Sequence, residues 1–520
     1  MKTLEPIYIL YPLVAAFTCL ILYYTARSRS SSKTPPEPRR WPIIGHLHLL
    51  GGPDLMHVKL AKLAEKYGPV MLLRIGVRPT LIVTDAHAAK ECFTTNDLAF
   101  ASRPSLPAGK VLGYDFAFIS WAPYGSYWRD LRRICTVELL SSRRLDNLSY
   151  IRHEETGKLV KQICEKCSDL GSVVAVREKL MDSVLDTTMR MVGGRKLLSF
   201  GRENERREFK ELVEQTFFYA GEPVIGDSLP WLWWLDLNGA QRAMNRIANR
   251  LDVFLQLWIN ERVKEGRSGD TEADFLDVIL NMAEDNSIAS LAEATPERRN
   301  AAIKTLLLVV LEATMDSTSV TIEWALSELI NKPQALHKAQ EEIDLKMGDE
   351  ERMVEESDLK DLPYVHAIVK ETLRLHLAGP LLVPHQSTTD CKVAGFEIPA
   401  GTQLLVNAWK IHRDPKWWDR PLEFEPERFI KGQGSYPDID VRGQHLQLIP
   451  FGTGRRSCPG ISLALSILHL SIARLLHAFK WEMPPSLSCL NMNEGPGLSS
   501  PKAIPLEALV IPKLAAKFYA

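Results

Sequence analysis

A lone cysteine lies in an unusual setting within residues 448–465, which read LIPFGTGRRSCPGISLAL. Two glycines and two arginines come just before Cys458, and a Pro-Gly step leads from it into an apolar segment with helical periodicity. Glycines permit a turn that brings backbone amides near the sulfur, and positive neighbours and a helix N-terminus stabilise a thiolate. The setting favours a metal-bound thiolate, and a nucleophilic thiol with a base nearby in space is the alternative.

A second candidate is the segment 306–330, LLLVVLEATMDSTSVTIEWALSELI, which has the length and apolarity of a buried helix. It nevertheless carries Glu312, Asp316, Ser317 and Thr318 in its middle. Acids and hydroxyls are costly to bury without partners, so their position in a core helix suggests a function. The alternative is that the hydroxyls bond back to the preceding turn of the helix.

The motif around Cys458 resembles the haem-binding loop of the cytochromes P450. Five positions match the family pattern F-x-x-G-x-R-x-C-x-G, namely Phe451, Gly454, Arg456, Cys458 and Gly460. Since one cysteine gives only one ligand, a macrocycle must supply the others, as in thiolate-ligated haem. The resemblance implies haem b as the cofactor, with its iron held by the Cys458 thiolate.

Two further motifs resemble the family's structural triad. KETLR places Glu371 and Arg374 three residues apart on one helix face, and FEPERF supplies Arg428. Taken alone, the first pair could be a surface ion pair. The resemblance implies instead that the three residues form a buried ionic triad beneath the haem.

Other residues would contact the haem propionates by the same resemblance. YWRDLRRI resembles the family's W-x-x-x-R helix, so Trp128 and Arg132 would bind one propionate. His385 occupies a position where the family has arginine or histidine facing the other propionate, and its charge depends on pH.

The 306–330 segment resembles the family's oxygen-activating helix, whose pattern is A/G-G-x-D/E-T-T/S. Here residues 313–318 read ATMDST, so Thr314 replaces the glycine and Ser317 replaces the threonine. The resemblance implies that Asp316 and Ser317 relay protons for cleavage of the O–O bond, with Thr318 as a stand-in. Ser317 keeps a hydroxyl that can donate and accept, so we expect monooxygenation with poorer coupling of electrons to product.

The elements that position these residues are mostly helices. Residues 130–380 show helical periodicity, while VMLLRIG with PTLIVTD, and CKVAGFEIPAGTQLLVNAW, read as hairpins. We find no internal repeat. The fold class is mainly α with small peripheral β-sheets (α+β), in one large cytochrome P450-type domain. The predicted divisions are 1–5 (lumenal N-terminus), 6–25 (transmembrane anchor), 26–45 (basic, proline-rich hinge) and 46–520 (haem-thiolate domain).

Residues 6–25 contain no charge over a length that spans the hydrocarbon layer, about 30 Å, as a helix. A cleaved signal peptide is the alternative, disfavoured by the bulky Tyr-Tyr end. Basic residues follow the segment, so we expect a single-pass protein of the endoplasmic reticulum membrane with its catalytic domain in the cytosol. The tryptophans in LPWLWWLDL (residues 229–237, Trp231 to Trp234) would touch the membrane or pack as a loop on the core.

A net charge of −1 offers no basic excess for nucleic acid. The eight cysteines form no regular framework, and the Cys164-Cys167 pair has no second pair with which to bind zinc, so we expect free thiols.

Nothing in the sequence binds a flavin or a nicotinamide, so the electrons must come from a partner. By analogy this partner is the membrane-bound NADPH–cytochrome reductase, docked on a cationic patch of Arg129, Arg133 and Arg455. The expected reaction is O₂-dependent oxidation of a small hydrophobic plant metabolite, such as a terpenoid, flavonoid or alkaloid. The alternatives are a haem-thiolate isomerase, lyase or dehydratase that needs no reductant, and a haem-binding membrane protein without catalysis.

Overall fold

The computed structural model describes Thr18 and residues 33–519, apart from 168–171, 200–202, 223, 237, 266–272, 286–287, 293, 349 and 437. The predicted anchor at 6–25 therefore lies outside the described residues. Within them, two helices are long and apolar enough to cross a membrane, and both are largely buried inside the body.

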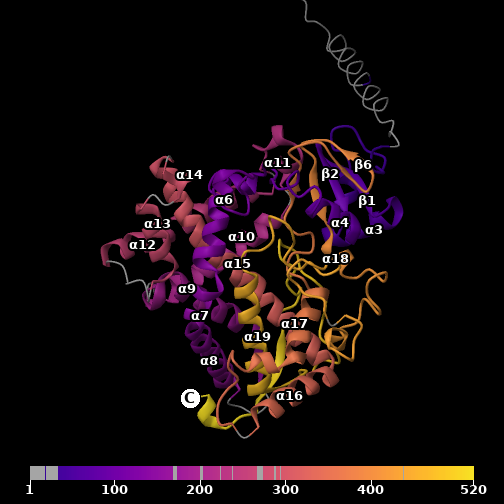
Figure 1. Cartoon of the computed structure of the whole chain (residues 1–520). Coiled ribbons are helices and arrows are strands. Elements are labelled where there is room, and N and C mark those ends of the chain that lie inside the picture. Colours follow the sequence, from indigo (N-terminus) through magenta and orange to yellow (C-terminus); the bar gives the residue numbers. More distant parts are fainter. Residues whose placement is uncertain are drawn as a thin grey trace, which may run out of the picture.

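Helices dominate the chain, and three small sheets lie at its edges (Figure 1). The helices are α2 (Leu47–Leu50), α3 (Met56–Tyr67), α4 (Ala86–Phe93), α5 (Pro107–Val111), α6 (Ser126–Arg133), α7 (Ser142–Asn147), α8 (Ser149–Lys166), α9 (Val176–Ser199), α10 (Glu203–Gly221), α11 (Ile225–Ser228), α12 (Ala240–Glu265), α13 (Phe275–Glu284), α14 (Ala289–Ala292), α15 (Pro296–Asn331), α16 (Pro333–Met347), α17 (Pro363–Leu375), α18 (Ala408–Ile411) and α19 (Ile461–Ala478). The predicted fold class is confirmed.

The strands are β1 (Val70–Ile75), β2 (Arg78–Val83), β3 (Val173–Ala175), β4 (His385–Gln386), β5 (Cys391–Val393), β6 (Phe396–Ile398), β7 (Gln403–Val406), β8 (Phe479–Glu482) and β9 (Glu507–Pro512). The hairpin predicted near residue 75 is confirmed as β1 and β2. The second predicted hairpin is only partly right: β5 pairs with β6, whereas β7 leaves them to lie parallel to β2. The first sheet has the order β1-β2-β7-β4.

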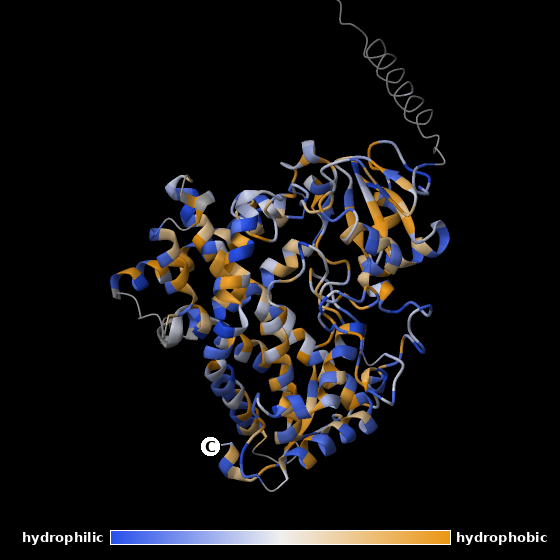
Figure 2. Ribbon diagram, in the orientation of Figure 1, coloured by the Kyte–Doolittle hydropathy of each residue, from blue (hydrophilic) through white to orange (hydrophobic). Residues whose placement is uncertain are grey.

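Helix α15 crosses the middle of the body and packs against α9, α17 and α19. Its start is well specified: the Thr295 hydroxyl accepts the Arg298 N–H, and Pro296 occupies the first turn. It ends at Asn331, just before Pro333, because a residue that precedes proline avoids the helical conformation. Apolar residues concentrate where α15 and α19 meet their neighbours (Figure 2).

The described part of the predicted hinge, residues 33–45, lies against the first sheet. The Pro36 carbonyl accepts the Leu72 N–H at 2.9 Å, and the Lys33 carbonyl accepts the Glu397 N–H at 2.7 Å. This part of the segment is therefore fixed to the body. All cysteines among the described residues are free thiols, as predicted.

Candidate haem-thiolate site

Cys458 is held in a tight loop just before α19. Its N–H donates to the Phe451 carbonyl at 2.9 Å, and Ser457 N–H donates to the Gly454 carbonyl at 3.1 Å. Gly454 has φ +74°, and a Cβ there would lie 2.6 Å from Asp97 Oδ1. A side chain at this position would therefore both strain the backbone and collide with α4's neighbouring loop, which explains the glycine.

Opposing effects act on the pKa of the Cys458 thiol. Burial raises the pKa of the Cys458 thiol, while the Gly460 N–H and the Arg132 guanidinium act to lower that pKa. Burial outweighs the other two, so the polypeptide alone does not hold this sulfur as a thiolate, as the loop sequence had suggested. A bound metal cation deprotonates a coordinating thiol outright, so iron at this position would overcome the effect of burial.

Arg132 and Trp128 both lie at this loop. Arg132 donates to the Ser457 carbonyl at 2.5 Å and to the Ser457 hydroxyl at 3.3 Å. Trp128 is buried, and the Arg456 guanidinium lies over its ring at 4.4 Å from the centroid. Helix α6 thus presents both side chains to the segment that carries Cys458, and the described bonds of Arg132 go to the protein.

Two arginines lie beside the loop: Arg103 is buried and Arg456 is partly buried. Arg456 donates to three backbone carbonyls, those of Ala101, Ile119 and Ala122. Arg103 donates to the carbonyls of Ser120, Val383 and Pro384. Among the described residues, neither arginine has a carboxylate partner.

The two guanidinium groups also repel each other. Burial and the Arg456 charge place the pKa of Arg103 well below its usual range, and burial lowers the pKa of Arg456 to about 9. Burying two cations without an anion is costly, and a ligand with two carboxylates would remove that cost. This donor set fits the two propionates of a haem.

His385 differs from expectation. Its Nδ1 lies 2.8 Å from the Phe100 carbonyl, which can only accept, so Nδ1 carries the hydrogen. Burial and then the Arg103 charge hold the pKa of His385 well below 6.5. The imidazole is therefore neutral and its Nε2 has no hydrogen, so its charge does not change with pH near neutrality, and its contact with a propionate stays a prediction.

Sequence reasoning missed Arg103. Its bonding partners come from segments 17 and about 280 residues away, which no local pattern brings together. The only local signal was an arginine before a proline, ASRPS, after an apolar stretch.

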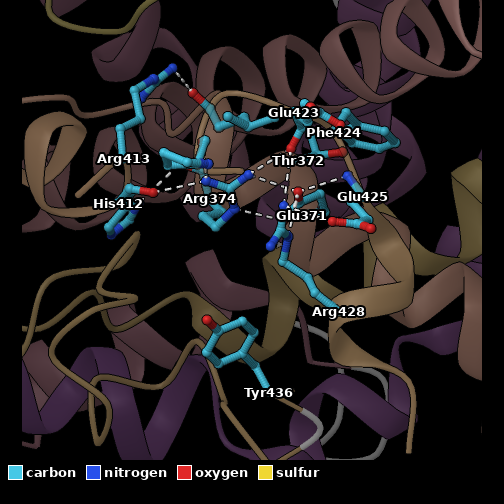
Figure 3. Close-up of polar contacts among 12 residues, drawn as sticks. Glu371, Thr372, Arg374, His412, Arg413, Glu423, Phe424, Glu425, Arg428 and Tyr436 are labelled. Atoms are coloured by element: carbon cyan, nitrogen blue, oxygen red, sulfur yellow. Dashed lines mark hydrogen bonds and ion pairs between the residues drawn. The ribbon is translucent and has the colours of Figure 1, made fainter. Parts of the chain in front are cut away.

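Glu371, Arg374 and Arg428 lie together as one buried cluster (Figure 3). Arg374 Nε and Nη2 each donate to a Glu371 oxygen at 2.7 Å, and Arg428 Nε donates to Glu371 Oε1 at 3.0 Å. The Glu425 N–H also donates to Oε1 at 2.8 Å. All three side chains are almost fully buried, and the alternative of a surface pair is therefore wrong.

His412 connects this cluster to the cysteine loop. Arg374 Nη1 donates to the His412 carbonyl at 2.9 Å, and His412 Nε2 accepts the Ile449 N–H at 2.8 Å. Burial lowers the pKa of His412 to about 3, so the ring stays neutral and Nε2 stays an acceptor. The segment that leads into the Cys458 loop is thereby linked to the cluster of Glu371, Arg374 and Arg428.

Helix α15 has one accessible stripe, formed by Ala313, Thr314 and Ser317. The Ser317 hydroxyl donates to the Ala313 carbonyl at 2.6 Å, as the back-bonding interpretation proposed. Thr318 is almost fully buried, and its hydroxyl has no partner among the described residues. Thr318 is therefore not part of the accessible stripe, and its role as a stand-in for Ser317 stays a prediction.

Asp316 lies beside the stripe, under the C-terminal loop. Its carboxyl bonds to the Ser499 side chain, while burial raises its pKa to about 6. A carboxyl with this pKa exchanges protons near neutral pH.

Comparisons with known proteins agree with this arrangement. The family model described as Cytochrome P450 matches residues 35–506. Demethylepipodophyllotoxin synthase of Sinopodophyllum hexandrum is 41% identical over 513 residues, 96% of each chain. Xanthotoxin 5-hydroxylase of Arabidopsis thaliana is 41% identical over 515 residues, 96% of this chain and 97% of its own.

Strychnine-10-hydroxylase of Strychnos nux-vomica is 40% identical over 504 residues, 95% of this chain and 93% of its own. In fold, the chain is similar to a zebra fish cytochrome P450 solved with progesterone, with a TM-score of 0.74, 24% identity, and 88% and 99% of the two chains covered. The matched region, the cysteine loop and the arginine pair lead to one assignment: this chain belongs to the cytochrome P450 family of haem-thiolate monooxygenases.

Proposed function

We propose that Cys458 is the axial thiolate ligand of the haem and that Arg103 and Arg456 receive its propionates. The observation that carries this proposal is the combination of a loop-held cysteine with two guanidinium groups, one buried and one partly buried, that have no anionic partner among the described residues. Trp128 packs under Arg456 and fixes its orientation. Phe451, Gly454 and Gly460 shape the loop around the sulfur.

The test is the absorption spectrum of the reduced, carbon monoxide-bound protein. Cys458→Ser replaces the soft ligand while keeping the side-chain size, and Cys391→Ser is a matched change at a half-buried thiol. We expect the thiolate-type band to vanish only in the first variant, with haem content measured separately. A Cys458→Ser protein with an unaltered band would overturn the assignment.

When bound, the haem supplies the reduction of O₂ and the insertion of one oxygen atom into a substrate. The chain contributes the protons. Asp316 holds one at a carboxyl whose pKa lies near neutrality, and Ser317 presents its hydroxyl on the accessible stripe of α15. Ser317 can pass a proton only after its hydroxyl turns away from the Ala313 carbonyl.

The substrate is a hydrophobic plant specialised metabolite that the enzyme hydroxylates. The three named relatives have different printed substrates or products, demethylepipodophyllotoxin, xanthotoxin and strychnine, at nearly equal identity. Overall sequence similarity therefore supports hydroxylation as the reaction type and does not identify the substrate. Incubation of the microsomal enzyme with pooled lignans, coumarins, flavonoids and alkaloids, followed by mass spectrometry, identifies the product.

A second candidate function is a rearrangement or dehydration that uses no reductant. The observation in its favour is that Thr314 fills the family's glycine position while the Ser317 hydroxyl is engaged with its own helix. Product formation without NADPH or O₂ would support it, and a strict requirement for both supports monooxygenation.

The electron donor we propose is the NADPH–cytochrome reductase, docked at the cysteine side of the body. Arg129 and Arg133 are exposed on α6, and Arg455 forms an ion pair with Asp97 at 3.0 Å. We therefore test the two exposed arginines of α6. Turnover should fall as salt rises, and an Arg129→Glu, Arg133→Glu variant should lose that dependence.

We also propose that the body rests on the endoplasmic reticulum membrane. Trp231, Trp233 and Trp234 expose more than half of their surface, as does Trp41. The segment just before the clustered tryptophans adjoins the β1–β2 turn, because the Val77 N–H donates to the Ser228 carbonyl at 3.0 Å. Helix α11 and strand β2 lie at the same end of the body (Figure 1). Tryptophan favours the lipid–water boundary. Changing the three clustered tryptophans to serine should weaken membrane retention of a chain that lacks residues 1–32.

A further inference from the structure

A carboxyl group adjoins the accessible stripe of α15 and has no partner there. Glu312 immediately precedes Ala313, the most accessible residue of the stripe, and is itself only 5% exposed. No hydrogen bond or ion pair joins Glu312 to another residue that the structure describes. Burial is the sole cause that raises its pKa, to about 8.

The other buried acids of this helix have at least one partner. Asp316 interacts with the Ser499 side chain, although its Oδ2 has no hydrogen-bond partner among the described residues. Glu323 pairs with Arg177 at 2.8 Å and accepts the Leu506 N–H at 2.7 Å. Glu328 lies 2.7 Å from His376. Glu312 thus differs from its neighbours in position, beside the stripe, and in having no counterpart on the chain.

Nearby charges do not compensate Glu312. Lys304, two turns earlier on α15, is bonded to Asp252 at 2.5 Å, and Arg177 is engaged by Glu323. Burial, and then the negative charges of Asp252 and Glu312, raise the pKa of the Tyr114 phenol. The described surroundings of Glu312 therefore supply no positive charge that compensates its carboxylate, which leaves that place to a cationic ligand.

We infer that Glu312 is a substrate-recognition residue that binds a protonated amine on the hydrophobic substrate. The ammonium N–H donates to the Glu312 carboxylate, and the two buried charges neutralise each other. The inference rests on the proposed function, because it takes the accessible stripe of α15 as the side from which substrate approaches. It narrows the substrate class to hydrophobic molecules that carry a basic nitrogen.

The experiment measures binding to the haem-loaded enzyme by equilibrium dialysis. The probes are a set of tertiary amines built on N,N-dimethyl-4-phenylbutylamine, each paired with its neutral amide, such as N,N-dimethyl-4-phenylbutanamide. The variants are Glu312→Gln, which keeps the shape and removes the charge, and Glu297→Gln, a matched change at an exposed position in the first turn of the same helix.

Wild type and Glu297→Gln should bind the amines about tenfold or more tighter than the amides, the range expected of a hydrogen bond to a charged group. Glu312→Gln should lose this preference while its affinity for the amides stays within about twofold. Equal binding of amine and amide by wild type, absence of binding of every amine, or a preference retained in Glu312→Gln would overturn the inference.

The carbon monoxide spectrum of the same preparations separates this outcome from failure of the proposed function. A normal thiolate band without amine preference removes only the role of Glu312. Absence of that band removes the haem assignment itself.

Discussion

The buried ionic cluster gives the sharpest structural prediction. Glu371→Gln changes one atom and removes one charge between two arginines that are 0% and 4% exposed. The amide oxygen can replace Oε1, which accepts from Arg374, Arg428 and the Glu425 N–H. The amide NH₂ then faces Arg374 Nε, so a donor meets a donor where a 2.7 Å bond stood.

The cost follows from the burial. Removing one partner of a buried charge pair costs about 3–5 kcal/mol, against a total stability of about 5–15 kcal/mol for a native protein. Glu425→Gln is the matched control, because its carboxylate is 24% exposed and Arg428 keeps Glu371 as its partner. A partly exposed ion pair contributes about 0–1 kcal/mol.

The assay is urea unfolding of the purified haem-loaded proteins, with the thiolate-type carbon monoxide band recorded at each step. Glu371→Gln should unfold at much lower urea than Glu425→Gln. The band should also decline before the helix signal does, because Arg374 supports the loop through His412 and Ile449. If the two variants were equally stable, the cluster would not stabilise the core and the reasoning would fail.

Three further predictions test the site and its surroundings. Ser317→Ala should lower product formed per NADPH severalfold with a matching rise in peroxide, whereas Thr318→Val should leave this ratio unchanged and gain about 1 kcal/mol, because it removes a buried hydroxyl without a partner. Arg103→Met should release haem to an acceptor protein at least about tenfold faster than wild type, as expected for a lost hydrogen bond to a charged group, and an unchanged rate would contradict the propionate assignment. Burial lowers the pKa of His412 and His469 to about 3 and of His477 to about 4, so below pH 6.5 the unfolded chain binds protons that the folded one does not. Stability should therefore fall by about 1.4 kcal/mol per pH unit for each of these histidines as pH drops from 6.5, and His469→Phe should reduce that slope in urea titrations.

Much of the fold is local enough to be predicted from sequence. Alternating β-branched residues around a glycine turn give β1 and β2, and apolar periodicity gives the core of α15. The predicted helix at 306–330 nevertheless begins ten residues late. The first turns of α15 are polar, and the available signal was the Thr295-Pro296-Glu297 start rather than hydrophobicity.

Pairings across long sequence separations were beyond local patterns. Residues 403–406 read as the continuation of a hairpin with 391–398, yet they form β7 beside β2, more than 300 residues away. The same limit explains Arg103, whose carbonyl partners come from two separate segments, at Ser120 and at Val383-Pro384. A sequence motif can identify Cys458, because the residues that form its loop are consecutive in the sequence.

The burial of Thr318 could not have been inferred from the sequence alone. Each residue of a helix advances by about 100°, so Ser317 lies near Ala313 and Thr318 lies near Thr314, and both of these neighbours are accessible. Helical periodicity alone therefore does not separate the two hydroxyls. The difference comes from the segments that pack over α15 and leave Thr318 only 1% exposed.

Charge pairing separates structural from ligand-facing residues in this chain. Glu371 is surrounded by the two arginines that neutralise it, so that cluster is complete within the polypeptide. Arg103 and Arg456 are cations without an anion, and Glu312 is an acid without a cation among the described residues. The first two are explained by a dianionic cofactor, and the third by a cationic substrate.

Replacing a buried glutamate with glutamine should therefore change the stability of the substrate-free protein in opposite directions at Glu312 and at Glu371. The pKa of Glu312 is about 8 when folded and near 4.5 when unfolded, so the folded chain binds the extra proton and stability declines as pH rises from 4.5 to 8. At pH 7 this linkage costs about 3 kcal/mol, which Glu312→Gln removes. Glu312→Gln should therefore be more stable than wild type by an amount that grows with pH, whereas Glu371→Gln is less stable at every pH. A Glu312→Gln protein no more stable than wild type at pH 8 would show that the carboxylate already has a partner, and the argument for a substrate amine would lose its basis.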